Sequence, residues 1–264
     1  MPLFFLRISC VVTLWSLLVC CQSHEGTVDR NMLLGNDYRL FQGTTLWEVA
    51  QAAQDDNAQR LAELVKARRL NVDTPEPRFG KTLLQLAVVN EDYTACQALL
   101  RLGAAPNAHD HTDGSSPLLK AAGGRDPAFM QLLLAHGGNP NDVEVGPRGP
   151  GNRRRDTPLI SAARRSLATV KVLVEAGANV GYENEFGTTA LSVALVQDHF
   201  ASALYLLQHG ADSRKPVLQR PNPHGRRPVY LREYLDEVRQ PGQNDAGIEM
   251  ILAFLRTQKE LPGH

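Results

Sequence analysis

The sequence predicts an all-α solenoid of helix–turn–helix repeats that follows an N-terminal export signal. A short motif with a hydroxyl residue, a leucine and an alanine recurs five times, and a second motif that ends in glycine recurs downstream of it. Self-similarity at a spacing of about 20 to 50 residues is typical of repeat architectures. Residues 1–23 differ from the rest because they carry almost no charge.

Residues 1–23 have the composition of a signal peptide. Arg7 is their one charged side chain, and residues 8–21 form an apolar run. Such a run after a positive start predicts export, and it is short for a membrane-spanning helix, which needs about 20 residues. Cleavage after Ser23 and lipidation at Cys21 both stay open, because the residues before Cys21 only loosely resemble the bacterial lipoprotein motif. An uncleaved anchor is a third alternative.

The first motif predicts the start of a helix in each repeat. The hydroxyl residue is expected to cap the helix by accepting from free backbone N–H groups. Proline follows at Pro117 and Pro158, where a first-turn proline is tolerated. The next leucine is expected to face the core, and the alanine lets neighbouring helices approach closely. The hydroxyl residues are Thr45, Thr82, Ser116, Thr157 and Thr189, at spacings of 37, 34, 41 and 32 residues.

The second motif predicts the second helix of each repeat. It carries a stripe of leucines and then a glycine that ends the helix in a left-handed conformation. These glycines are Gly103, Gly137, Gly177 and Gly210. Each unit is therefore a helix–turn–helix followed by an extended loop.

The five copies resemble the ankyrin repeat, whose unit of about 33 residues carries "TPLH-x-A" at its first helix. The resemblance covers residues 43–213. Residues 24–42 are expected to form a leader, and residues 214–264 a divergent capping helix pair behind a proline-rich connection. One departure is that the family's histidine is absent, so its hydrogen bond to the cap is lost or altered. The residues in its place are Gln85, Leu119, Ile160 and Ser192.

Charge and motifs argue against several other functions. The 28 basic and 28 acidic side chains balance, whereas nucleic-acid binders usually have a basic excess. No catalytic motif is present, and we expect Cys96 to be a small hydrophobic residue rather than a nucleophile. His109 and His111 could supply metal ligands, but no further ligands are evident. We therefore predict no enzyme activity, no cofactor and no metal.

The loop between the third and fourth repeats is the strongest candidate for a binding site. It is about eight residues longer than the repeat unit requires, its glycines and prolines exclude a helix, and it is rich in arginine. A solvated, disordered insert is the alternative. The resemblance implies that the residues after the first helix of each repeat face the concave side of the solenoid. Residues of other repeats therefore join the loop in the predicted binding site. The predicted partner-binding residues are Arg148, Arg153, Arg154, Arg155, Arg164, Arg165, Asn90, Gln197, His109, His111, Tyr182 and Glu183.

The resemblance implies a non-catalytic protein–protein interaction module, which we expect to act as a monomer on an acidic protein surface. With the export signal, we expect a periplasmic or secreted bacterial protein. Exported bacterial ankyrin proteins of this size resemble immunity proteins, which bind and block toxins delivered by rival cells. Two alternatives stay open. One is a periplasmic accessory protein for stress resistance, for example peroxide defence, and the other is a secreted effector that binds a host or competitor protein.

Overall fold

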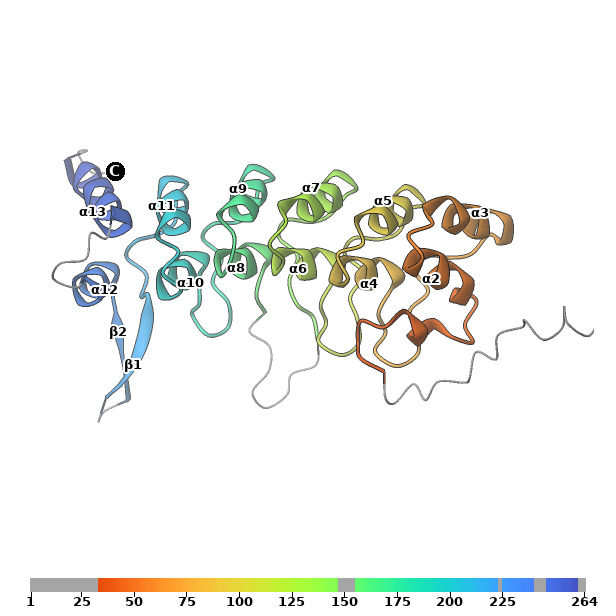
Figure 1. The fold of residues 1–264 in the computed structure, drawn as a ribbon. Coiled ribbons are helices and arrows are strands. Elements are labelled where there is room, and N and C mark those ends of the chain that lie inside the picture. Colours follow the sequence, from red (N-terminus) through yellow and green to blue (C-terminus); the bar gives the residue numbers. More distant parts are fainter. Residues whose placement is uncertain (1–32, 147–154, 223–224, 240–245, 261–264) are drawn as a thin grey trace, which may run out of the picture. The chain divides into compact units, whose positions relative to one another are not determined.

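The computed structural model describes residues 33–146, 155–222, 225–239 and 246–260. The predicted signal peptide and the predicted arginines Arg148, Arg153 and Arg154 lie outside these residues. Two rows of helices form one compact unit that begins at Leu34, with the first helix of each pair in one row and the second helix in the other (Figure 1). None of the described helices is long and apolar enough to cross a membrane.

The predicted helix pairs are present in the described residues. The first row holds α2 (Trp47–Gln54), α4 (Leu83–Val89), α6 (Pro117–Ala122), α8 (Pro158–Ala163), α10 (Ala190–Val196) and α12 (Leu231–Val238). The second row holds α3 (Ala58–Arg68), α5 (Tyr93–Arg101), α7 (Pro127–Ala135), α9 (Leu167–Glu175), α11 (Phe200–Gln208) and α13 (Ala246–Glu260). The leucine and alanine of each motif are buried between the rows, so the stack shares one hydrophobic core.

Four of the five predicted helix caps are confirmed. Thr82, Ser116, Thr157 and Thr189 each accept a hydrogen bond from the backbone N–H three residues on. The predicted cap at Thr45 is wrong, because α2 begins after Leu46 without a side-chain cap. The hydroxyl of Thr44 donates to the carbonyl of Phe41 at 2.6 Å and accepts from the Leu46 N–H, so the turn comes one residue earlier.

The predicted leader contributes to the core at its end. Residues Tyr38–Phe41 form a short 3-10 helix, η2, and Phe41 is fully buried. Tyr38 Oη donates to Asp92 Oδ2 at 2.5 Å, which joins this segment to the second repeat. Residues 34–46 therefore pack on the first repeat and link it to the second.

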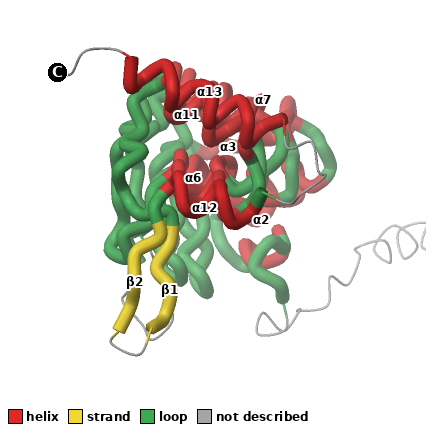
Figure 2. The backbone as a smooth tube through the Cα atoms, turned by 90° about the vertical axis from the view of Figure 1, so that its left-hand side faces the viewer, coloured by secondary structure: helices red, strands yellow, loops and turns green. Residues whose placement is uncertain are grey.

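The C-terminal part begins with a β-hairpin that the sequence does not predict. Strands β1 (Leu218–Asn222) and β2 (Gly225–Val229) pair antiparallel, with Leu218 opposite Val229. The first helix of the predicted capping pair, α12, begins after the hairpin at Leu231. Prolines are tolerated in this ribbon because each of its two strands has a free edge. Figures 1 and 2 show the hairpin projecting on the same side as the loops that precede the first-row helices.

Candidate protein-binding groove

The loop between α9 and α10 is organised by Asn184. This side chain is buried, and its Oδ1 accepts hydrogen bonds from the backbone N–H groups of Phe186 and Thr188, both at 2.9 Å. Asn184 Nδ2 donates to Asp156 Oδ1 at 2.6 Å. These bonds hold the turn in one conformation, and they leave the Phe186 side chain 65% exposed.

Asp156 connects this loop to α8. Its buried carboxylate accepts from Asn184 on one oxygen and from Arg164 Nη2 at 2.7 Å on the other. A buried carboxylate needs such partners, because removing one leaves its charge unpaired in a medium of low polarity. The ion pair therefore fixes the guanidinium of Arg164, a predicted site residue, beside the loop.

A groove beside α10 brings three predicted residues together. We call it the α10 groove; it has a volume of about 560 Å³, and its lining includes Arg164, Glu183, Phe186, Val196, Gln197 and Arg226. Phe186 and Val196 are large apolar side chains that are 65% and 44% exposed. An exposed apolar pair with charged groups at its edge is the pattern of a protein interaction site.

The two ends of the long loop between α7 and α8 are anchored on neighbouring loops. At the first end, the backbone N–H of Val145 donates to the carbonyl of Gly114 at 3.0 Å. At the second end, Tyr182 Oη donates to the carbonyl of Arg155 at 2.9 Å, and Arg155 Nε lies 3.0 Å from Glu185 Oε1. Tyr182 and Arg155 therefore hold the base of the loop.

Glu144 lies beside the first anchored end and is half-buried. Burial raises the pKa of its carboxyl, and the nearby charge of Asp156 adds to the rise. Because a raised pKa means that the folded state disfavours the ionised form, Glu144 destabilises the fold at neutral pH relative to acidic pH.

Asn90 is bound within the chain. Its Nδ2 donates to the carbonyl of Asn36 at 2.9 Å, and its Oδ1 accepts from Asn36 Nδ2 at 3.1 Å. Both polar atoms of this predicted site residue are thus engaged within the chain. Arg165 and His111 are exposed, and Glu183 of the α10 groove forms an ion pair with Lys215 at 2.6 Å.

Ser116, Asp142 and His109 lie together without the geometry of a nucleophilic triad. Ser116 Oγ donates to Asp142 Oδ2 at 2.5 Å, and the other oxygen of Asp142 lies 3.1 Å from His109 Nε2. A triad needs the histidine, rather than the carboxylate, against the hydroxyl. Ser116 is also fully buried as a helix cap, so this cluster is structural.

Cys96 is fully buried, and burial raises the pKa of its thiol to about 12. A thiol that stays protonated at neutral pH is a poor nucleophile. Across the described residues, no group of three or more His, Cys, Asp and Glu side chains is arranged to hold a metal ion.

A family model described as ankyrin repeats (3 copies) matches residues 84–184 and 141–216. Together these matches span just over half of the chain. The chain belongs to the ankyrin-repeat family. An ankyrin array is a protein–protein interaction module, which is consistent with the expectation that the chain is not an enzyme.

Curated relatives support the same assignment over their repeat regions. The chain is 31% identical over 170 residues to "Ankyrin repeat and KH domain-containing protein mask-1" of Caenorhabditis elegans, a match that covers 64% of the chain and 6% of the relative. It is 35% identical over 116 residues to "B-cell lymphoma 3 protein homolog" of Mus musculus, covering 44% and 24%. For "Neurogenic locus notch homolog protein 2" of Homo sapiens, the identity is 29% over 163 residues, covering 61% and 6%. The chain thus spans less than a quarter of each of these relatives.

Of the α10-groove residues named above, Phe186, Val196 and Arg226 were not predicted from the sequence. Phe186 gave a usable signal, since it is a large apolar residue within a polar turn. Val196 was missed because it follows a run of buried apolar residues in α10, and from the sequence it looks like one more buried position. Arg226 gave no signal, because its position depends on the unpredicted hairpin.

Proposed function

We propose that this chain is an exported binding protein that holds a partner protein in the α10 groove. The observation that carries the proposal is the presence of two exposed apolar side chains, Phe186 and Val196, in one groove with Arg164 and Arg226. Apolar anchors within a polar rim dominate the binding energy of many interfaces. Arg226 is exposed and lacks an ion-pair partner among the described residues, which favours an acidic partner surface.

Export is the part of the proposal that rests on the sequence of residues 1–23. The chain would then meet its partner outside the cytoplasm, as a monomer, with lipidation at Cys21 as one way to stay at the membrane. Cell fractionation tests this directly. Recovery of the full-length protein in the cytosol alone would contradict export.

The specific role that we propose is inhibition of a delivered toxin in a bacterial periplasm. A stoichiometric inhibitor needs a rigid complementary surface and no chemistry, and the Asn184 and Asp156 network supplies rigidity beside the groove. Cells that export the wild-type chain should survive expression of a toxin encoded next to its gene, and cells that export the Phe186→Asp variant should not.

A pull-down with matched variants tests the groove itself. The wild-type chain and a Glu63→Ala control, altered on an exposed face of α3, should capture the same protein from periplasmic extract. Phe186→Asp and Val196→Asp variants should each lose it, because a charge replaces an apolar anchor. Equal capture by all four proteins would place binding elsewhere on the array.

A further inference from the structure

The last helix pair differs from the pairs before it. In each preceding pair the two helices contact each other directly, whereas α12 and α13 make little contact with each other. Each of these helices also contacts the repeat that precedes it. Tyr234 Oη on α12 donates to the carbonyl of Leu195 at 3.0 Å, and Gly247 lets α13 approach Phe200 on α11 so closely that a Cβ there would lie 2.6 Å from the Phe200 Cβ.

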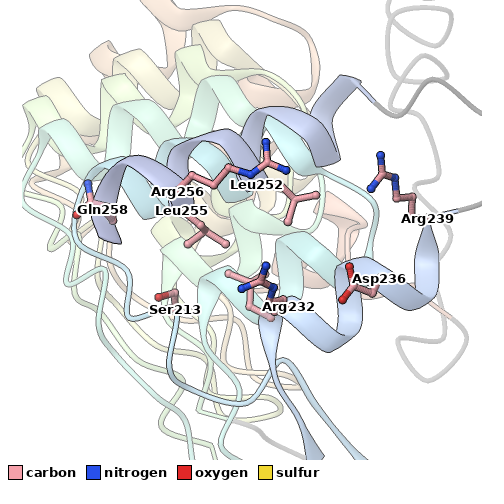
Figure 3. Close-up of a pocket in the computed structure, with 9 residues that line it drawn as sticks. Ser213, Arg232, Asp236, Arg239, Leu252, Leu255, Arg256 and Gln258 are labelled. Atoms are coloured by element: carbon pink, nitrogen blue, oxygen red, sulfur yellow. The ribbon is translucent and has the colours of Figure 1, made fainter. Parts of the chain in front are cut away.

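This arrangement leaves a groove between α12 and α13, which we call the end groove. It has a volume of about 600 Å³, and its lining combines Leu231, Leu252 and Leu255 with Arg232, Arg239 and Arg256. Figure 3 shows Leu255 on α13 and Arg232 on α12 facing the space between the two helices.

The charge of the end groove selects the kind of occupant. Three arginines and one acidic residue, Asp236, line it. Arg239 forms an ion pair with Glu249, whereas Arg232 and Arg256 have no ion-pair partner among the described residues. A second copy that docked the same groove face to face would bring these unpaired guanidinium groups together, which is unfavourable. An acidic occupant would instead satisfy them with charge-assisted hydrogen bonds.

We propose that the end groove binds an acidic amphipathic helix of another protein. Leucine-type side chains on one face of that helix would cover Leu252 and Leu255, and carboxylates along its edges would pair with Arg232 and Arg256. This is the helix-in-groove mode of recognition. The site is separate from the α10 groove, and it stands whether or not that groove binds a toxin.

Two synthetic helical peptides test the proposal. Both are about 15 residues long, the length of α13, and both carry leucines at the same helical spacing. One carries glutamates at the other positions, and the other carries lysines there. Binding to the purified chain is followed by fluorescence anisotropy. We expect the glutamate peptide to bind at least about tenfold more tightly than the lysine peptide, and its affinity to fall several-fold between about 50 and about 500 mM salt.

Charge reversal locates the binding. The Arg232→Glu/Arg256→Glu double variant should lose at least about tenfold in affinity for the glutamate peptide and gain affinity for the lysine peptide. Both residues are exposed, so the fold should tolerate the change. The matched control, Arg60→Glu/Arg101→Glu on the exposed surface of α3 and α5, should bind like the wild type.

Three results would overturn the proposal. The first is no binding of the glutamate peptide below about 1 mM. The second is equal binding by the two double variants. The third is sedimentation showing that the chain dimerises through this groove, which would make a second copy the occupant. A Phe186→Asp variant should bind the glutamate peptide like the wild type. The test of the end groove is therefore independent of the test of the α10 groove.

Discussion

Replacing Asn184 by alanine removes the side chain that organises the α9–α10 loop. The substitution deletes the oxygen that accepts from the backbone N–H groups of Phe186 and Thr188, and the amide group that donates to Asp156. Asn184 and Asp156 are both buried, so the lost bond to the carboxylate is not readily replaced by water. The expected result is a less stable fold with a loosened loop.

The magnitude follows from these three bonds. A neutral hydrogen bond contributes about 1 kcal/mol to the free energy of unfolding, and a bond to a charged group about 2 kcal/mol. Water can reach the N–H groups of Phe186 and Thr188 once the loop opens, which returns part of the loss. We therefore expect the free energy of unfolding to fall by about 3 kcal/mol.

Urea unfolding measures the change, and limited proteolysis of the native protein reports on the loop. Asn184→Asp is the matched variant, because it keeps an acceptor oxygen but replaces the donor NH2 with an oxygen of a second carboxylate beside Asp156. Two close carboxylates raise the pKa of one of them, so this variant should be less stable at pH 7 and recover as the pH falls. A loss below about 0.5 kcal/mol for Asn184→Ala, with unchanged proteolysis, would refute the reasoning.

Three further predictions concern other parts of the array. Gly114→Ala should lower the free energy of unfolding, measured in urea, by about 1 to 3 kcal/mol. The φ of Gly114 is +61°, and a Cβ there would lie 1.8 Å from the Gly146 nitrogen. Gly103 also has a positive φ but has open space around it, so Gly103→Ala should lower the free energy of unfolding by less. Glu144→Gln should raise the Tm at pH 7, because it removes the cost of an ionised carboxylate at a half-buried site. This gain in Tm should shrink as the pH falls toward the usual glutamate pKa of about 4.3, since Glu144 of the wild type then becomes protonated and the cost disappears. Cys96 should react with a thiol reagent only after unfolding, and rapid reaction of the native protein would contradict its burial.

The repeat helices were predictable from the sequence because their signals are local. A hydroxyl residue caps the helix that begins next to it, and a glycine ends the helix just before it, so Thr82, Ser116 and Gly103 needed no knowledge of distant contacts. The cap prediction at Thr45 was wrong because the preceding segment, rather than the repeated motif, determines where the turn before α2 lies. The family resemblance followed from the same local signals, repeated in phase.

The candidate site was less predictable because it depends on contacts far apart in sequence. Arg164 and Gln197, which were predicted from their common position after a first-row helix, both line the α10 groove. Asn90 has the same position but pairs with Asn36, 54 residues earlier, which no local pattern reveals. The hairpin that contributes Arg226 contains prolines at positions that a strand pattern would exclude.

The two ends of the repeat stack are held unequally. At the N-terminal end, Asn36 and Tyr38 fasten the leader to the second repeat across 54 residues, so opening the first repeat also breaks contacts with the second. At the C-terminal end, α12 and α13 are each attached to the preceding repeat from one side. Because repeat arrays lose structure from their weakest boundary, unravelling should start at α13 and move toward the centre. A helix seated in the end groove would delay that first step, and the partner would then set the lifetime of the folded array.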